Sequence, residues 1–250
     1  LQDANGVQLT ASYNSLGQKL QVSDPNQGDS SYQYNGFGEL EQETDANGLM
    51  IRFDYDQLGR QISRTSYAGN TVKESAQFSF DTGLIGFPYQ ESANGAVRTF
   101  GYDAVGNLTT NTVAIDSKSF TNQYFYDESS GLQKGMRYPN GLTLQYAYTP
   151  SGYLQEVSNL ASGYVYRTIN TQDAYGNMLD TSLGNGVFSD NQYDSETGWV
   201  QSLTAWRGSS RVHDVEYQQY DVFGNLEQVT NHLTGAQEHY IYDELHRLTD

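Results

Sequence analysis

The chain has 250 residues, enough for one large β domain or two ordinary domains. Its 13 Lys and Arg against 30 Asp and Glu give a net charge of −17, a field that repels nucleic acid phosphates and anionic membrane surfaces, so nucleic acid is not an expected partner. Because there is no Cys, disulfides and thiolate metal sites are excluded. No apolar run in the sequence is long enough to span a membrane.

Tyrosine is the residue type that says most about the fold. The apolar fraction is only 36%, yet 21 residues are Tyr, so buried surface must depend on aromatic side chains, which favour sheets over helix bundles. The 25 Gly are scattered along the chain, and no Pro-, Ser- or charge-rich stretch indicates a linker. We therefore expect residues 1–250 to form a single repeat array without an internal domain boundary.

A short motif recurs from one end of the chain to the other. It consists of an aromatic residue, then Asp or Asn, with Gly four residues after the aromatic, and successive copies start 21 to 27 residues apart. About eleven units begin at Tyr13, Tyr34, Tyr55, Phe80, Tyr102, Tyr126, Tyr148, Gln172, Tyr193, Tyr220 and Tyr242. The candidate structural residues are Tyr13, Tyr34, Tyr55, Asp56, Gly59, Arg60, Tyr102, Asp103, Gly106, Tyr126, Asp127, Tyr148, Gly152, Tyr193, Asp194, Tyr220, Asp221, Gly224, Tyr242 and Asp243.

The segment that leads into each motif is a predicted strand. In residues 49–55, Leu, Ile, Phe and Tyr alternate with Met, Arg and Asp, which is typical of a strand with one buried face. A Gly lies seven residues before several of the unit aromatics and usually follows Asn, and Asn-Gly favours a two-residue hairpin turn. We expect such turns at Asn5-Gly6, Asn47-Gly48, Asn94-Gly95 and Asn140-Gly141.

The Tyr-Asp-x-x-Gly step predicts a turn that reverses the chain. The Asp side chain can accept from the backbone N–H two residues on, and Gly can adopt positive φ. Return segments such as that of Leu154, Val157 and Leu160 have three-residue apolar spacing, but they are too short for stable helices and are interpreted as bulged strands.

Each unit therefore supplies about two strands, and eleven units supply on the order of twenty. An open twisted sheet of that size must curl, which predicts an all-β, antiparallel, curled or spiralling sheet. Because like positions of neighbouring repeats lie side by side, we expect each unit tyrosine to be buried and stacked on the next unit's aromatic.

Other candidate sites are weaker. His232, His239 and His246 lie seven residues apart, and surface strand and turn positions are a better interpretation than metal ligands. The acidic and amide residues of 24–29 lack the final Glu of a calcium loop and predict a turn. No catalytic motif is present, so we expect no enzymatic activity, no catalytic residues, no metal and no cofactor.

The motif resembles the YD repeat, or RHS repeat, of bacterial Rhs proteins, of the B and C components of Tc toxin complexes and of animal teneurins. The segments that carry the resemblance are Tyr55-Asp56-Gln57-Leu58-Gly59-Arg60, Tyr102-Asp103-Ala104-Val105-Gly106-Asn107-Leu108 and Tyr220-Asp221-Val222-Phe223-Gly224-Asn225-Leu226. Residues 126–132 with Tyr138-Pro139-Asn140-Gly141 are similar to the variant unit of the bacterial members. The resemblance covers essentially the whole chain.

The resemblance implies a segment of a hollow β-shell that encloses and delivers a polypeptide cargo, which is expected to be a bacterial toxin. It also implies flanking repeats of the same polypeptide as partners and a secreted or cell-surface bacterial location. The self-cleaving core motif of the bacterial shells has no match here, since the one Asp-Pro, at Asp24-Pro25, lies in an ordinary turn context. The chain stops inside a unit, which we interpret as truncation. The alternative hypothesis is a module that binds carbohydrate or a cell surface through exposed aromatics.

Overall fold

The structure is a computed structural model that describes residues 8–249, and every regular element in that range is a β-strand. The strands are β1 (Thr10–Tyr13), β2 (Lys19–Asp24), β3 (Gly28–Tyr34), β4 (Leu40–Thr44), β5 (Leu49–Tyr55), β6 (Gln61–Ala68), β7 (Thr71–Phe80), β8 (Pro88–Ala93), β9 (Ala96–Tyr102), β10 (Leu108–Ile115), β11 (Lys118–Tyr126), β12 (Gln133–Arg137), β13 (Thr143–Tyr148), β14 (Leu154–Asn159), β15 (Val165–Gln172), β16 (Met178–Leu183), β17 (Val187–Tyr193), β18 (Val200–Arg207), β19 (Ser210–Tyr220), β20 (Leu226–Asn231) and β21 (Ala236–His239). No described segment is a helix that could cross a membrane.

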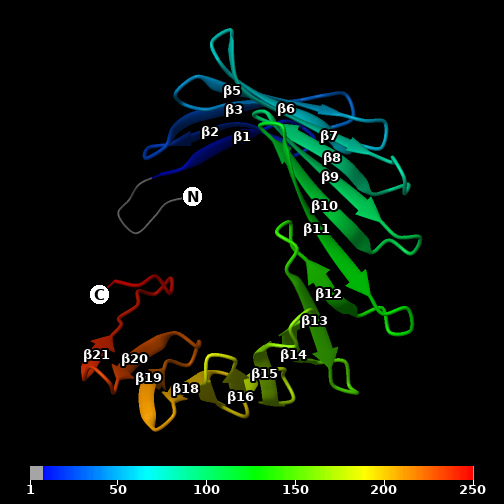
Figure 1. The fold of residues 1–250 in the computed structure, drawn as a ribbon. Helices are drawn as coiled ribbons and strands as arrows, with labels where there is room; N and C mark the ends of the chain where they lie inside the picture. The colour runs from blue at the N-terminus through cyan, green and yellow to red at the C-terminus, as the bar shows by residue number, and fades with distance from the viewer. Residues whose placement is uncertain (1–7, 250) are drawn as a thin grey trace. The chain divides into compact units, whose positions relative to one another are not determined.

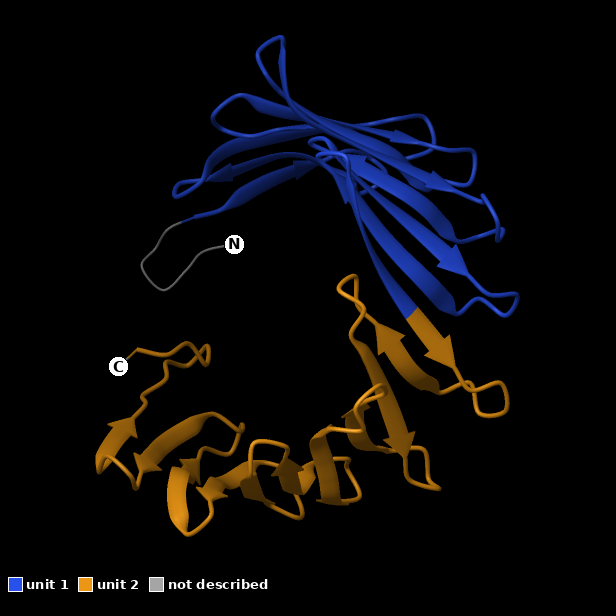
Figure 2. Cartoon of the chain, viewed as in Figure 1, with its two compact units in different colours: residues 1–123 blue, residues 124–250 orange. Residues whose placement is uncertain are grey.

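The chain divides into two compact units, residues 1–123 and 124–250 (Figure 2). In the first, each strand pairs antiparallel with the next along the chain, from β1–β2 to β10–β11 (Figure 1). In the second the same pattern runs from β12–β13 to β20–β21. All 21 strands are antiparallel members of a sheet, which confirms the all-β repeat fold and the expected strand number.

The return strands are bulged at the place where they leave the turn. In the β5–β6 hairpin Asp54 lies opposite Ser63 but Tyr55 lies opposite Gln61, so one residue of the return strand has no direct partner. The same register shift occurs beside Tyr148 in the β13–β14 hairpin. A bulge displaces the apolar spacing from two residues to three, which confirms the interpretation of the return segments as bulged strands rather than helices.

Residues 1–123 and residues 124–250 each form a single layer of sheet with little core. The chain exposes 16347 Å² of surface, whereas a compact globule of this mass exposes roughly 11,000 Å². The buried apolar residues of the described chain are Ile51 and Ile169, one in each unit. Each lies directly opposite a buried hydroxyl residue on the next strand, Ser66 and Thr181 respectively. Small side chains therefore fill the middle of the sheet between larger, half-buried neighbours.

The one-sided pattern predicted for residues 49–55 is present in β5. Ile51 is buried and Phe53 and Tyr55 are half-buried, while Arg52 and Asp54 on the other face are exposed. The alternation follows from the two-residue period of a strand.

Turns occur at the three described Asn-Gly pairs, as predicted, and one of them has the expected two-residue form. Asn94 and Gly95 have φ values of 51° and 81° and form the expected two-residue turn. At Gly48 and Gly141 only the glycine has positive φ, and its N–H donates to a carbonyl three residues back, that of Asp45 or Tyr138. The carboxylate of Asp45 also accepts from the N–H groups of Asn47 and Leu49, which stabilises the longer turn. Asn5-Gly6 lies outside the described residues.

Candidate functional site: the YD turns and the junctions between units

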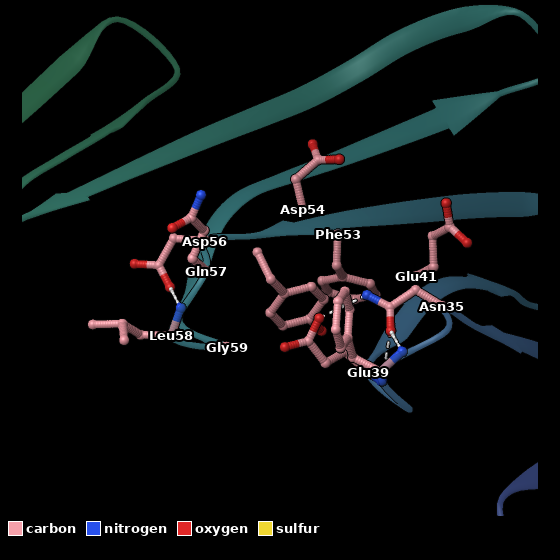
Figure 3. A pocket seen from close by; sticks show the side chains of 11 residues that line it. Asn35, Glu39, Glu41, Phe53, Asp54, Asp56, Gln57, Leu58 and Gly59 are labelled. Carbon is pink, nitrogen blue, oxygen red and sulfur yellow. Dashed lines mark hydrogen bonds between the residues drawn. The ribbon is translucent and has the colours of Figure 1, made fainter.

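The best-defined local geometry of the chain is the turn that follows each unit aromatic. At Tyr55 the Asp56 carboxylate accepts from the N–H groups of Leu58 (2.9 Å) and Arg60 (3.0 Å). The backbone closes the loop, because Asp56 N–H donates to Arg60 C=O and Gly59 N–H donates to Asp56 C=O. With φ of 75° at Gly59, this is a type I turn followed by a left-handed residue, the three-residue hairpin loop. Figure 3 shows the bond from Leu58 to Asp56.

The same turn recurs at most of the predicted units. The side chain after the first unit aromatics is Asn rather than Asp, and Asn14 and Asn35 accept the same pair of backbone N–H groups. The other turns of this kind follow the aspartates Asp103, Asp173, Asp221 and Asp243. In the last of these turns His246 takes the place of glycine with φ of 58°. An Asp or Asn side chain that accepts from nearby backbone N–H groups thus stabilises the turn both in residues 1–123 and in residues 124–250.

Two predicted units have a turn that is one residue longer. Gly131 N–H donates to Asp127 C=O, and the Asp127 carboxylate accepts from the N–H groups and hydroxyls of Ser129 and Ser130. These bonds, led by the Ser129 hydroxyl, hold the pKa of Asp127 well below its usual range. Asp194 is bonded in the same way by backbone groups and Thr197. The variant spacing after Tyr126 and Tyr193 therefore has a direct structural cause.

Four of the unit tyrosines bond the preceding repeat through their hydroxyl groups. Tyr55 Oη donates to Leu40 C=O at 2.8 Å, and Tyr220 Oη donates to Val200 C=O at 2.7 Å. Tyr148 and Tyr242 make the same bond to earlier return segments. Sequence reasoning missed this role. The available signal was that nine of the eleven unit starts are Tyr and one is Phe, a preference that indicates use of the hydroxyl.

The unit tyrosines pack less deeply, and on different partners, than predicted. Tyr34, Tyr102, Tyr126 and Tyr193 are half-buried, while Tyr13 is 59% exposed. The ring contacts among described residues do not include the expected stacking of one unit tyrosine on the next.

The aromatic partners come instead from the start of the preceding return segment. Phe87 lies against Tyr102 and Trp199 against Tyr220, each pair with ring centroids 4.9 Å apart. The bulge at the start of each return strand turns these side chains toward the next turn. For this reason Tyr102 and Tyr220 contact the return segment and not the aromatic residue of the next repeat.

At several junctions the residue that follows a turn glycine also covers the turn glycine of the next repeat. A Cβ added at Gly59 would lie 2.9 Å from Glu39 Oε1, and one at Gly106 would lie 2.9 Å from the Phe87 ring. At Gly224 the Trp199 ring would be 3.0 Å away, whereas at Gly152 the nearest neighbour, Leu132, is 4.0 Å away. The turn glycines thus supply positive φ, which His246 adopts in the last turn, and they permit close approach at several junctions.

Arg60 forms a charged junction between its own turn and the next repeat. Its guanidinium donates to Asp56 at 2.7 Å and, with both terminal nitrogens, to Asp81 of the next unit at 3.0 and 2.5 Å. It also lies 4.4 Å from the centre of the Phe80 ring. Bidentate pairing of this kind fixes orientation as well as charge. The Arg60 hydrogen bond lowers the pKa of Asp81 to about 2.

Acid should weaken this junction. The pKa of Asp81 falls from 3.8 in an unpaired state to about 2, so the paired carboxylate stabilises the fold above the higher value and loses that effect as the pH falls through the lower one. We expect Asp81→Asn to lower the urea midpoint at about pH 7 and to do so progressively less toward about pH 2. Asn tolerates the positive φ of 65° at this position. Unfolding monitored by circular dichroism across this range is the measurement.

Asp116→Asn is the matched control. Asp116 also has positive φ, 47°, and is exposed in a hairpin turn. The difference between the midpoint changes of Asp81→Asn and Asp116→Asn should shrink as the pH falls from about 7 to about 2. A difference that stays constant with pH would contradict the assignment of an ionic role to the junction.

Candidate ligand sites are open grooves rather than enclosed cavities. One groove in residues 1–123 is lined by Phe37, Phe53 and the Tyr55 turn (Figure 3). In the described residues no group of three or more His, Asp or Glu is placed to hold a metal ion. His232 lies 2.9 Å from Glu216, and His246 lies 2.9 Å from Asn225, so the two side chains serve separate local contacts. Residues 24–29 form a turn in which the carboxylate of Asp24 accepts from backbone N–H groups.

These features define a tandem-repeat β protein whose recurrent geometry lies in the turns and in the junctions between repeats. The family model named RHS Repeat matches residues 13–50 and 34–72. A curated relative, double-stranded DNA deaminase toxin A of Burkholderia cenocepacia, is 24% identical over 176 residues, which cover 70% of this chain and 11% of the relative.

Solved structures show the same fold over nearly the whole chain. A TcdB2-TccC3 structure matches with a TM-score of 0.80 and a TcdB2-TccC3-Cdc42 structure with 0.79, each at 18% identity over 98% of this chain. A mutant Tc holotoxin pore of Photorhabdus luminescens also matches with a TM-score of 0.79. The chain spans 14% of these matched chains. The RHS Repeat match of residues 13–72 and the shared fold support the YD-repeat, or RHS-repeat, resemblance that the motif predicted.

Proposed function

We propose that this chain is a segment of a shell wall that encloses and delivers a polypeptide cargo, a toxin of a secreted or cell-surface bacterial system, and that residues 1–250 act as one repeat array. The observation that carries this proposal is the single-layer sheet of repeated hairpins with scarcely any core of its own. A globular domain buries its sheet against a second layer. A one-layer sheet suits a wall, whose two faces meet different surroundings.

The comparisons support the same proposal. The matched structures are of TcdB2-TccC3 complexes, one of them described as lacking a hypervariable C-terminal region, and the curated relative is named a toxin. Those names describe larger proteins of which this chain spans a small fraction. The shared part is the repeat, so the proposal assigns the repeat to the wall and the toxic activity to other parts of such polypeptides.

A structural role also fits the hydrogen bonding of the repeated turn carboxylates. Asp103 accepts from two backbone N–H groups and from the Asn107 side chain, whose hydrogen bond lowers the pKa of Asp103. Asp243 is bonded in the same way with Arg247. Carboxylates committed to several turn hydrogen bonds are poor general acids or bases at neutral pH. We therefore infer that this stretch is not enzymatic.

The carbohydrate-binding alternative has less support. A sugar platform needs an exposed aromatic face. The unit tyrosines after the first are half-buried, and Tyr55, Tyr148 and Tyr220 direct their hydroxyls to backbone carbonyls. Glycan-array binding that is lost when these tyrosines are replaced would reverse this preference.

Protease protection of the whole polypeptide that contains residues 1–250 tests the proposal. We expect the cargo segment to resist a protease that degrades it when it is produced alone. A Gly59→Val, Gly106→Val double variant should expose it, because both substitutions disrupt turns of the wall, while Gln57→Val should leave it protected. Equal cleavage of the cargo within the parent polypeptide and alone would contradict enclosure.

A further inference from the structure

One edge of the sheet in residues 1–123 carries a row of exposed apolar side chains. Each belongs to the residue just before the glycine of a unit turn, and their exposed fractions lie between 75% and 92%. The row consists of Leu16, Phe37, Leu58, Ile85 and Val105. Figure 3 shows the Leu58 side chain pointing out of its turn and away from Phe53. We call these five residues the turn row.

The antiparallel topology places the whole turn row at the same edge. The strands β1, β3, β5, β7 and β9 all run in one direction, and each ends at a unit turn. The turns at the opposite edge are made of polar or small residues. They comprise residues 25–27, 45–48, 69–70, 94–95 and 116–117, whose types are Pro, Asn, Gln, Asp, Ala, Gly and Ser. The sheet therefore has an apolar edge and a polar edge.

The fold itself does not need apolar residues in the turn row. The turn is held by the Asp or Asn side chain, by backbone hydrogen bonds and by glycine, and the residue before glycine takes part in these bonds through its backbone N–H. Any residue type fits such an exposed place. In residues 124–250 the equivalent place is apolar at Tyr175, Phe223 and Leu245, which are 64% to 73% exposed, and polar in the other three unit turns. Repeated exposure of large apolar groups marks an interaction surface.

The spacing of the turn row restricts what can cover it. Successive unit turns are two strands apart, or roughly 10 Å, so five turns extend over about 40 Å. A partner must offer apolar groups with the same period to contact every turn. A second row of YD turns has that period by construction, and two identical rows can interdigitate around a twofold axis. A lipid surface has no such period, and the net charge of −17 opposes binding to anionic membranes.

We propose that the turn row is a docking edge that takes a second row of YD turns, so that two copies of this chain associate through it. The contact is apolar, and like charges on the two copies oppose it. Association should therefore strengthen as salt screens the repulsion. This proposal stands apart from cargo enclosure, because it depends only on the edge chemistry of residues 1–123.

Sedimentation velocity of the 250-residue chain over a concentration series tests it. We expect a monomer–dimer equilibrium that Phe37→Ser, Leu58→Ser, Val105→Ser weakens by at least about 100-fold, since three large apolar groups per copy lose their contacts. The matched control is Val72→Ser, Ile115→Ser, Phe120→Ser, which removes as many exposed apolar groups from strands rather than unit turns. The control should dimerise like the parent. Circular dichroism should show that both variants remain folded.

The other outcomes would overturn the proposal. A parent chain that stays monomeric, or a turn-row variant that associates as tightly as the parent, would mean that the row does not mediate self-association. The second result would point to the unpaired edges of the terminal strands. Flotation of a monomeric parent with zwitterionic vesicles, lost in the turn-row variant, would instead assign the row to a lipid surface.

Discussion

Replacement of either buried isoleucine by alanine is expected to destabilise the chain by about 2–4 kcal/mol, because the lost methyl and methylene groups leave space that a hydrogen-bonded sheet fills only in part. Ile51 is 9% exposed and Ile169 is 6% exposed, and they are the buried apolar side chains of the described residues. In a sheet with so little core, no other layer compensates for the loss. Urea denaturation followed by circular dichroism measures the change.

The loss of stability should be greatest in the part of the chain that carries the substitution. Repeat arrays transmit stability mainly between neighbours, so Ile51→Ala should raise hydrogen exchange first in residues 1–123 and Ile169→Ala first in residues 124–250. Val72→Ala serves as the control, since Val72 is 54% exposed and its truncation should stay within about 0.5 kcal/mol of the parent. Identical exchange patterns for the two isoleucine variants would show that the chain unfolds as one cooperative unit.

The parts of the fold that were predictable from the sequence are those in which a residue acts on its own backbone. The Asp56 carboxylate accepts from the N–H groups two and four residues later, and Gly59 adopts the left-handed conformation. Both roles can therefore be predicted from the six residues 55–60 alone. The alternation of residues 49–55 is equally local. Repetition of these signals at intervals of 21 to 27 residues was enough to predict the strand number and the antiparallel order.

The junctions between units were not predictable, because their partners lie far apart in the sequence. Tyr220 bonds a carbonyl 20 residues earlier, and the choice of Val200 depends on the bulge in the return strand. The bulge likewise brings Trp199 onto Tyr220 in place of another unit tyrosine. The turn at Gly48 was misjudged for a related reason, since the upstream carboxylate of Asp45 stabilises a longer loop than Asn-Gly alone favours.

A comparison of two substitutions in one turn isolates the role of the glycine. Gly59→Val should lower the free energy of unfolding by roughly 1–3 kcal/mol, because a β-branched residue at φ of 75° is strained and its Cβ would approach Glu39 at 2.9 Å. Gln57 is exposed in the same turn, and Gln57→Val should change the free energy by less than about 0.5 kcal/mol. Because Glu39 ends in a flexible carboxylate that can move aside, backbone strain accounts for most of the expected loss at Gly59. Removal of that carboxylate in Glu39→Ala should therefore rescue little of the Gly59→Val defect, and a full rescue would show that steric contact, not φ, makes glycine necessary there.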